Sequence, residues 1–124
     1  MSLILIVEDN EKNMKLVRDV LQAKGYATVE AVTGEDGVRL AAERMPDMIL
    51  MDIQLPGING IEALRQLRTN PATAAIPAVA VTASVMQQDR KQITEAGFDA
   101  YVGKPINLKE FLETVRAVLT KSAE

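Results

Sequence analysis

Residues 48–52, Met48-Ile49-Leu50-Met51-Asp52, decide the fold: four consecutive apolar residues are followed by a carboxylate. Two further apolar runs have the same design. Residues 3–7 (LILIV) end in Glu8-Asp9, and residues 78–81 (AVAV) end in Thr82. Runs this short, without polar alternation, are typical of strands buried on both faces of a parallel sheet. Weaker strand candidates are residues 27–32 and residues 100–102.

The segments between these runs carry helical signals. Gly25, Asn70-Pro71 and Gly97 are stop signals, and three pairs predict capping boxes at helix starts: Thr33 with Asp36, Ser84 with Gln87, and Asn107 with Glu110. The order is therefore strand–helix, repeated five times. This order predicts an α/β fold with one parallel five-stranded sheet, right-handed crossovers and helices on both faces. The common strand order of such a doubly wound sheet is 2-1-3-4-5.

The composition excludes several classes of protein. The 124 residues, 48 % of them hydrophobic, suffice for one domain. The absence of cysteine and histidine excludes disulfides, thiolate catalysis, zinc or haem sites with these ligands, and a kinase that phosphorylates its own histidine. A net charge of −3 without a basic run or a tryptophan makes us expect no nucleic-acid partner. No apolar run approaches about eighteen residues and no signal peptide is evident, so we expect no membrane association and a cytoplasmic location.

Polar side chains follow the predicted strands at the edge where an open parallel sheet binds ligands. Glu8-Asp9, Asp52 and Thr82 follow the first, third and fourth strands, and Lys104 follows the fifth after one glycine. In the order 2-1-3-4-5 the reversal lies between strands one and three, so the three carboxylates straddle the binding crevice. Because carboxylates repel one another, and because an all-oxygen donor set selects a hard cation, the sequence predicts a Mg²⁺ site.

The same residues suit phosphoryl transfer. Mg²⁺ favours sites that also take phosphate oxygens, and a lysine and a hydroxyl supply positive charge and a hydrogen-bond donor for those oxygens. A carboxylate can itself be the nucleophile and form an aspartyl phosphate. The residues therefore predict a phospho-acceptor in which Asp52 attacks, while the metal, Lys104 and Thr82 neutralise the charge.

Four stretches carry a resemblance to a known family: residues 6–10 (IVEDN), 46–60 (PDMILMDIQLPGING), 80–83 (AVTA) and 96–105 (AGFDAYVGKP). In order and spacing, over essentially the whole chain, they resemble the receiver domain of two-component response regulators. Residues 13–16 and 51–56 look most like the DivK group of single-domain receivers. The resemblance implies the flavodoxin-like (CheY-like) form of the doubly wound fold.

The resemblance implies a role for each acidic residue. Asp52 would be the phosphorylated aspartate, and Asp9 would bind Mg²⁺ directly. Glu8 would bind the ion through water, and the backbone carbonyl of Gln54 would be a further ligand. Many receivers have an aspartate where this chain has Glu8, but a longer carboxylate still reaches a metal-bound water.

The resemblance also implies how the site is switched. Lys104 would bridge to Asp52 and then to the phosphoryl group, with a cis bond to Pro105. Thr82 and Tyr101 would be the switch pair, and Ala83 would line the pocket. Two more positions, Gln54 and Ser84, would govern the approach of water to the phosphoryl group.

Partners follow from the same resemblance. Since the chain lacks histidine, the donor would be a sensor histidine kinase or a histidine phosphotransfer protein. Few residues follow the last predicted helix, so we expect residues 1–124 to be one receiver domain without an output domain. Output would then be a protein bound at the face of the fourth helix, fifth strand and fifth helix, roughly residues 86–119. Alternatives are the receiver of a larger regulator or hybrid kinase, or a phosphorelay intermediate.

The same residues also have other interpretations. Glu8, Asp9 and Asp52 could be helix caps or strand ends, Lys104 a surface lysine, and Tyr101 a half-buried structural residue. An aspartyl-phosphate enzyme of the haloacid-dehalogenase type needs a second aspartate where this chain has Gln54, so we expect no enzyme beyond self-phosphorylation and dephosphorylation. A flavin or nucleotide binder needs a phosphate loop, and neither GxxxxGK[ST] nor GxGxxG occurs. A receiver that serves only as an interaction module would lack part of the site.

Overall fold

The computed structural model describes the backbone of residues 2–83 and 87–123. Within these residues, five parallel strands form one sheet in the order β2-β1-β3-β4-β5, and a helix follows each strand. The strands are β1 (Leu3–Val7), β2 (Ala27–Ala31), β3 (Met48–Asp52), β4 (Ala78–Thr82) and β5 (Ala100–Gly103). The helices are α1 (Glu11–Ala23), α2 (Gly34–Arg44), α3 (Gly60–Thr69), α4 (Gln87–Ala96) and α5 (Leu108–Ala123). The predicted α/β fold and strand order are confirmed.

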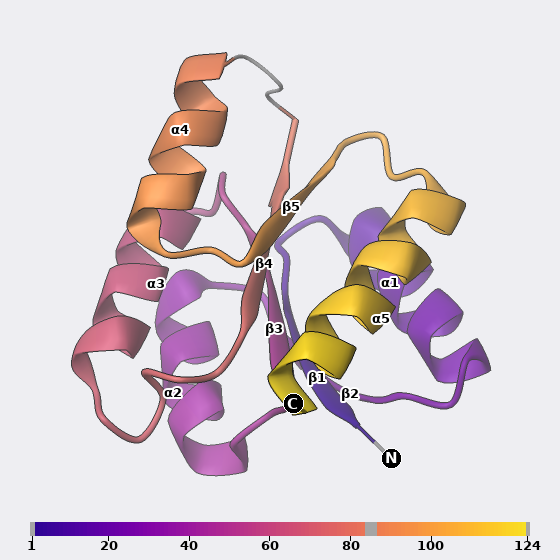
Figure 1. Ribbon diagram of the computed structural model, residues 1–124, viewed down its shortest axis with the longest axis horizontal. Helices are drawn as coiled ribbons and strands as arrows, with labels where there is room; N and C mark the ends of the chain where they lie inside the picture. The colour runs from indigo at the N-terminus through magenta and orange to yellow at the C-terminus, as the bar shows by residue number, and fades with distance from the viewer. Residues whose placement is uncertain (1, 84–86, 124) are drawn as a thin grey trace.

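Helices cover both faces of the sheet, which is seen nearly edge-on in Figure 1, with α1 and α5 on one face and α2, α3 and α4 on the other. Alternation along each strand divides its side chains between two cores. Leu5 of β1 packs in the core that includes Leu64 of α3, whereas Ile4 packs in the core that includes Phe111 of α5. Every residue of β3 and β4 is buried. This burial on both faces explains why their sequences are unbroken apolar runs.

Helix boundaries follow local signals in the sequence. The side chains of Asn10, Thr33 and Asn59 cap α1, α2 and α3, each accepting the N–H of the residue three positions on, and Asn107 does the same at the start of α5. Gly25 and Gly97, with φ of +90° and +105°, follow α1 and α4 in a conformation that costs glycine little. The helix starts predicted at Thr33 and Asn107 are confirmed. The pair Ser84–Gln87 falls on residue 84, outside the described residues.

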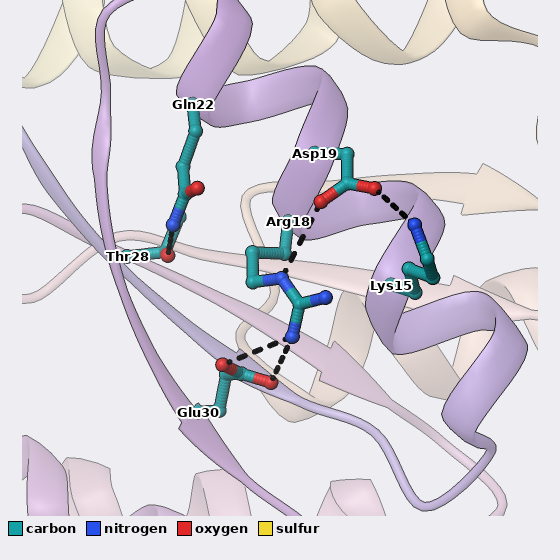
Figure 2. Close-up of polar contacts among 6 residues, drawn as sticks. All are labelled: Lys15, Arg18, Asp19, Gln22, Thr28 and Glu30. Carbon is teal, nitrogen blue, oxygen red and sulfur yellow. Dashed lines mark hydrogen bonds and ion pairs between the residues drawn. The ribbon is translucent and has the colours of Figure 1, made fainter.

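Polar side chains connect α1 to β2, the strand at one edge of the sheet (Figure 2). The Arg18 Nη1 atom lies 3.3 Å from the Glu30 Oε1 atom, and Gln22 Nε2 donates a hydrogen bond of 2.9 Å to Thr28 Oγ1. Such exposed contacts are worth only about 0.2–1 kcal/mol each. They orient β2 against α1, while the fold itself depends on the buried central strands.

Two strand boundaries differ slightly from those predicted. β2 ends at Ala31, and Val32 beyond it is exposed, whereas β5 continues through Gly103. In the part of the chain that the structure describes, no helix is both long enough and apolar enough to cross a membrane.

Candidate functional site

The carboxyl ends of four strands deliver the predicted site residues to one edge of the sheet. Asp52 and Thr82 are the last residues of β3 and β4, Glu8-Asp9 follow β1 directly, and Lys104 follows β5. Because β1 and β3 are neighbours in the sheet, the carboxylates after them face the same crevice. The structure therefore brings together the acidic residues and the lysine that the sequence singled out.

Lys104 joins two buried carboxylates. Its Nζ atom lies 2.8 Å from Asp52 Oδ2 and 3.2 Å from Glu8 Oε1. Asp52 is 3 % exposed and Glu8 is 5 % exposed. The other carboxylate oxygen of Asp52, Oδ1, accepts a hydrogen bond of 2.9 Å from the backbone N–H of Gln54. Asp52 is thus held at both oxygens at the floor of the crevice.

Burial and crowding of charge govern the protonation of this cluster. Burial, followed by the hydrogen bond and charge of nearby Asp52, raises the pKa of Glu8 to about 7, although Lys104 acts in the opposite direction. Burial alone lowers the pKa of Lys104, but its hydrogen bond to Asp52 and the charges of Asp52 and Glu8 outweigh burial and raise it. Glu8 is therefore only partly ionised at neutral pH, while Lys104 stays charged.

The cluster also has the donor atoms of a hard-cation site. One carboxylate oxygen from each of Glu8, Asp9 and Asp52 lies within 4.8 Å of the other two, and Asp9 is the exposed member. All these donors are oxygen, and histidine and cysteine are absent from the sequence. Such a donor set fits Mg²⁺, which prefers carboxylates and keeps several waters. Burial is the main reason that the pKa of Glu8 is raised, and a divalent cation would offset the smaller contribution from the charge of Asp52.

The two predicted switch residues share one face of the sheet. Thr82 is buried, and its backbone carbonyl accepts a hydrogen bond of 2.8 Å from the Lys104 N–H. Tyr101 pairs in register with Ala80, two residues before Thr82, and is 38 % exposed. The Lys104–Pro105 bond is cis, as the resemblance implied.

The family model for the response regulator receiver domain matches residues 4–116. The chain belongs to this family. The receiver is also 45 % identical over 116 residues to the polar-differentiation response regulator DivK of Brucella ovis, a match that covers 94 % of each chain. The predicted family and the likeness to the DivK group are confirmed.

Solved structures of receivers superimpose closely on this one. A response regulator from Chloroflexus aurantiacus has a TM-score of 0.92 at 28 % identity, covering 96 % of this chain and 98 % of that one. The receiver domain of a sensor histidine kinase from Pseudomonas aeruginosa has a TM-score of 0.89 at 32 % identity, with the same coverage, and holds a magnesium ion in its active-site cleft. The chain is therefore a two-component signalling receiver, a class whose partners are kinases or phosphotransfer proteins. Its acidic cluster is consistent with a Mg²⁺-dependent phospho-acceptor site.

Gly60 supports the site of the receiver and was not singled out by the sequence analysis. A methyl group on Gly60 would collide with the backbone carbonyl oxygen of Asp52 and lie 2.9 Å from the Cα atom of Ile53. The Gly60 N–H also donates a hydrogen bond of 3.0 Å to the Ile53 carbonyl. α3 can therefore begin directly against the backbone that carries Asp52. The glycine after the Asn59 cap was the available signal, but a turn glycine looks the same in sequence.

We expect Gly60→Ala to lower the free energy of unfolding by about 1–3 kcal/mol, because the new methyl group must displace backbone. Heteronuclear NMR should show shifts of the Ile53 and Gln54 amides, which lie in the displaced loop. Gly25→Ala is the control, because residue 25 has a positive φ but open space around its Cβ position. This substitution should lower the free energy of unfolding by roughly 1–2 kcal/mol through backbone conformation alone. Unchanged chemical shifts of the Ile53 and Gln54 amides in Gly60→Ala would contradict the close approach of Gly60 to the Asp52 backbone.

The raised pKa of Glu8 predicts how the stability of the metal-free receiver depends on pH. The ordinary pKa of this carboxyl is 4.5 and its folded value is about 7, so the folded chain keeps a proton that the unfolded chain releases. Unfolding then releases a proton, and stability falls as pH rises from about 4.5 to about 7. Denaturant titrations in EDTA should show this fall relative to Glu8→Gln, which cannot ionise. Parallel pH profiles for the two proteins would contradict it.

Proposed function

We propose that Asp52 accepts a phosphoryl group from a phosphohistidine of a sensor kinase or phosphotransfer protein, and that this reaction switches the binding of a second protein. The observation that carries the proposal is the 2.8 Å contact between Lys104 Nζ and Asp52 Oδ2 inside a cluster of three carboxylates. An ammonium in this position pairs with the free carboxylate and then with the oxygens of a phosphoryl group attached to it.

The chain places at this edge the nucleophile and two of the groups that stabilise the transferred phosphoryl group. A carboxylate oxygen of Asp52 forms a bond to phosphorus while the bond from phosphorus to the histidine nitrogen breaks, and that nitrogen keeps the electron pair. Lys104 neutralises charge on the transferred oxygens, and the Thr82 hydroxyl donates a hydrogen bond to one of them. Asp52 needs no general base, because a carboxylate is already ionised when it attacks.

Mg²⁺ completes this proposed site. Asp9, Asp52 and the backbone carbonyl of Gln54 would hold the ion directly, and Glu8 would hold it through water. When bound, the ion supplies positive charge to the phosphoryl oxygens. The carboxylate cluster and the magnesium ion in the Pseudomonas aeruginosa receiver support this assignment.

Within this proposal the chain works as a single receiver unit that catalyses only its own phosphorylation and dephosphorylation. Gln54 offers water no acid or base, and the companion position Ser84 lies outside the described residues. A phosphorelay or hybrid-kinase role is the second candidate, which the 32 % identity to the receiver of a sensor histidine kinase favours. In that role the phosphoryl group passes on to another histidine.

The output surface proposed is the face of α4, β5 and α5. Thr82 and Tyr101 would couple it to Asp52: the Thr82 hydroxyl moves toward a phosphoryl oxygen, and Tyr101 turns from its exposed position into the space vacated. A partner that prefers one of these two states is then selected. Of the expected face, residue 86 and the side chains of residues 87–89 lie outside the described residues.

Phosphorylation of the receiver should depend on Asp52. With a phosphohistidine protein or a small phosphoramidate as donor, Asp52→Asn should take up no label, since an amide is not a nucleophile. The label on the parent should be base-labile, as an acyl phosphate is. Asp47→Asn is the matched control, because Asp47 is an exposed aspartate outside the acidic cluster, and its side chain accepts the Leu3 N–H. Label retained by Asp52→Asn, or mapped to a serine or threonine, would refute the assignment.

Mg²⁺ should stabilise the unphosphorylated receiver, because the unfolded chain offers no preformed site. At a Mg²⁺ concentration ten times the Kd, the gain is about 1.4 kcal/mol, which raises the Tm by several degrees. Asp9→Asn should abolish the effect. Asp19→Asn makes the same chemical change on an exposed part of α1 and should leave the effect intact. A Tm indifferent to millimolar Mg²⁺ at low ionic strength would contradict the site.

A further inference from the structure

Arg90 of α4 covers the ring of Tyr101. Its guanidinium carbon lies 5.6 Å from the ring centroid, within the range of a cation–π contact. Tyr101 is 38 % exposed, and Arg90 is exposed. The contact therefore joins two outward-lying side chains from different elements of the proposed output face.

Strand alternation explains why Tyr101 meets α4. Its neighbours Ala100 and Val102 pack in the core on the α1 and α5 face, so the Tyr101 side chain leaves β5 on the opposite face. That is the face covered by α2, α3 and α4 (Figure 1). Its partner in register, Ala80 of β4, is small and fully buried, and Thr82 lies two residues further on. Arg90, an exposed residue of α4, thus contacts the ring on the face of the sheet to which Ala80 and Thr82 of β4 also belong.

We infer that Arg90 is a positioning residue that holds Tyr101 outward in the unphosphorylated receiver and so sets the threshold of the switch. The inference rests on the proposed function, in which Tyr101 turns inward when Asp52 is phosphorylated. The cation–π contact exists only while the ring is outward, so it favours the resting state. Tyr101 also lines a groove of about 290 Å³ together with Glu110 and Thr114 of α5, which belong to the proposed output face.

Linkage gives the inference a measurable consequence at Asp52. If Arg90 favours the resting state, its loss must strengthen binding of any ligand at Asp52 that favours the switched state, by the same factor. An exposed cation–π contact corresponds to a factor of about two to five. The loss of the Arg90 charge by itself would have the opposite effect on affinity, because removal of a cation weakens the binding of an anionic phosphoryl mimic.

The first experiment measures the affinity of the receiver for beryllofluoride with Mg²⁺, a mimic of the phosphoryl group. Arg90→Gln should bind beryllofluoride about two to five times more tightly than the parent. Arg90→Lys keeps a cation, so its affinity for beryllofluoride should lie closer to that of the parent. Lys91→Gln is the matched control: it removes the same charge from the next residue of α4, where Lys91 is 76 % exposed and paired with Glu95. In a Thr82→Ala background, which uncouples the switch, the gain from Arg90→Gln should disappear.

The second experiment observes the ring directly. The chain has two tyrosines and no tryptophan, so Tyr26→Phe leaves Tyr101 as its only tyrosine fluorophore. Quenching of the fluorescence lifetime by acrylamide, which is neutral and therefore insensitive to the charge change, then reports the exposure of Tyr101. In this background, Arg90→Gln without beryllofluoride should lower quenching toward the value that the parent reaches with beryllofluoride and Mg²⁺.

The outcomes separate this inference from the proposed function. Unchanged quenching in Arg90→Gln overturns the inference, whatever beryllofluoride does. Lower quenching without tighter beryllofluoride binding also overturns it, because the contact would then hold the ring without biasing the site. If beryllofluoride leaves Tyr101 quenching unchanged in the parent, the switch in the proposed function fails, and the role of Arg90 fails with it.

Discussion

Two buried carboxylates held by one ammonium are the constraint on which the rest of the site depends. Lys104 lies within ion-pair distance of both Glu8 and Asp52, which are almost fully buried. Removing an ionised carboxylate from water costs several kcal/mol unless partners compensate. Compensation is incomplete: burial, followed by the hydrogen bond and charge of Asp52, raises the pKa of Glu8 despite Lys104. A third carboxylate, Asp9, stands beside this pair. The cluster is stable enough to persist and remains receptive to a further cation.

The architecture holds this cluster together against its own repulsion. Asp52 and Lys104 are 52 residues apart in the chain, and they meet because β3, β4 and β5 are consecutive in the sheet. The Lys104 N–H is fixed to the Thr82 carbonyl, and α3 begins at Gly60, in direct contact with the backbone of Asp52. Local charge repulsion is thus opposed by apolar burial on both faces of the central strands, which is the larger effect.

The same sheet connects the acidic crevice to a distant surface. Asp52 pairs in register with Val81, and Thr82 with Gly103, so the strand that ends at the crevice neighbours the strand that carries Tyr101. In the proposed switch, a change of charge at Asp52 therefore needs to move only the residues at the ends of two adjacent strands. Contacts on the outer side of Tyr101, such as the one from Arg90, then decide how readily the ring responds.

The sequence alone determined the elements of the fold and the residue types at the carboxyl edge. Unbroken apolar runs, caps such as Thr33 and stop glycines act through neighbours in the chain, so their structural effect can be predicted without tertiary contacts. The family followed from motifs in register across the whole chain. The strand order was predicted because 2-1-3-4-5 is the common order of a doubly wound five-stranded parallel sheet.

Only the tertiary structure decided how these residues act on one another. The sharing of Lys104 between two carboxylates, the burial that raises the pKa of Glu8, the approach of Gly60 to Asp52 and the contact of Arg90 with Tyr101 all join different elements. The physical reason is that desolvation, ion pairing and steric contact depend on distances of a few ångströms between residues that are remote in the chain, and sequence patterns carry only the spacing of residues that are near.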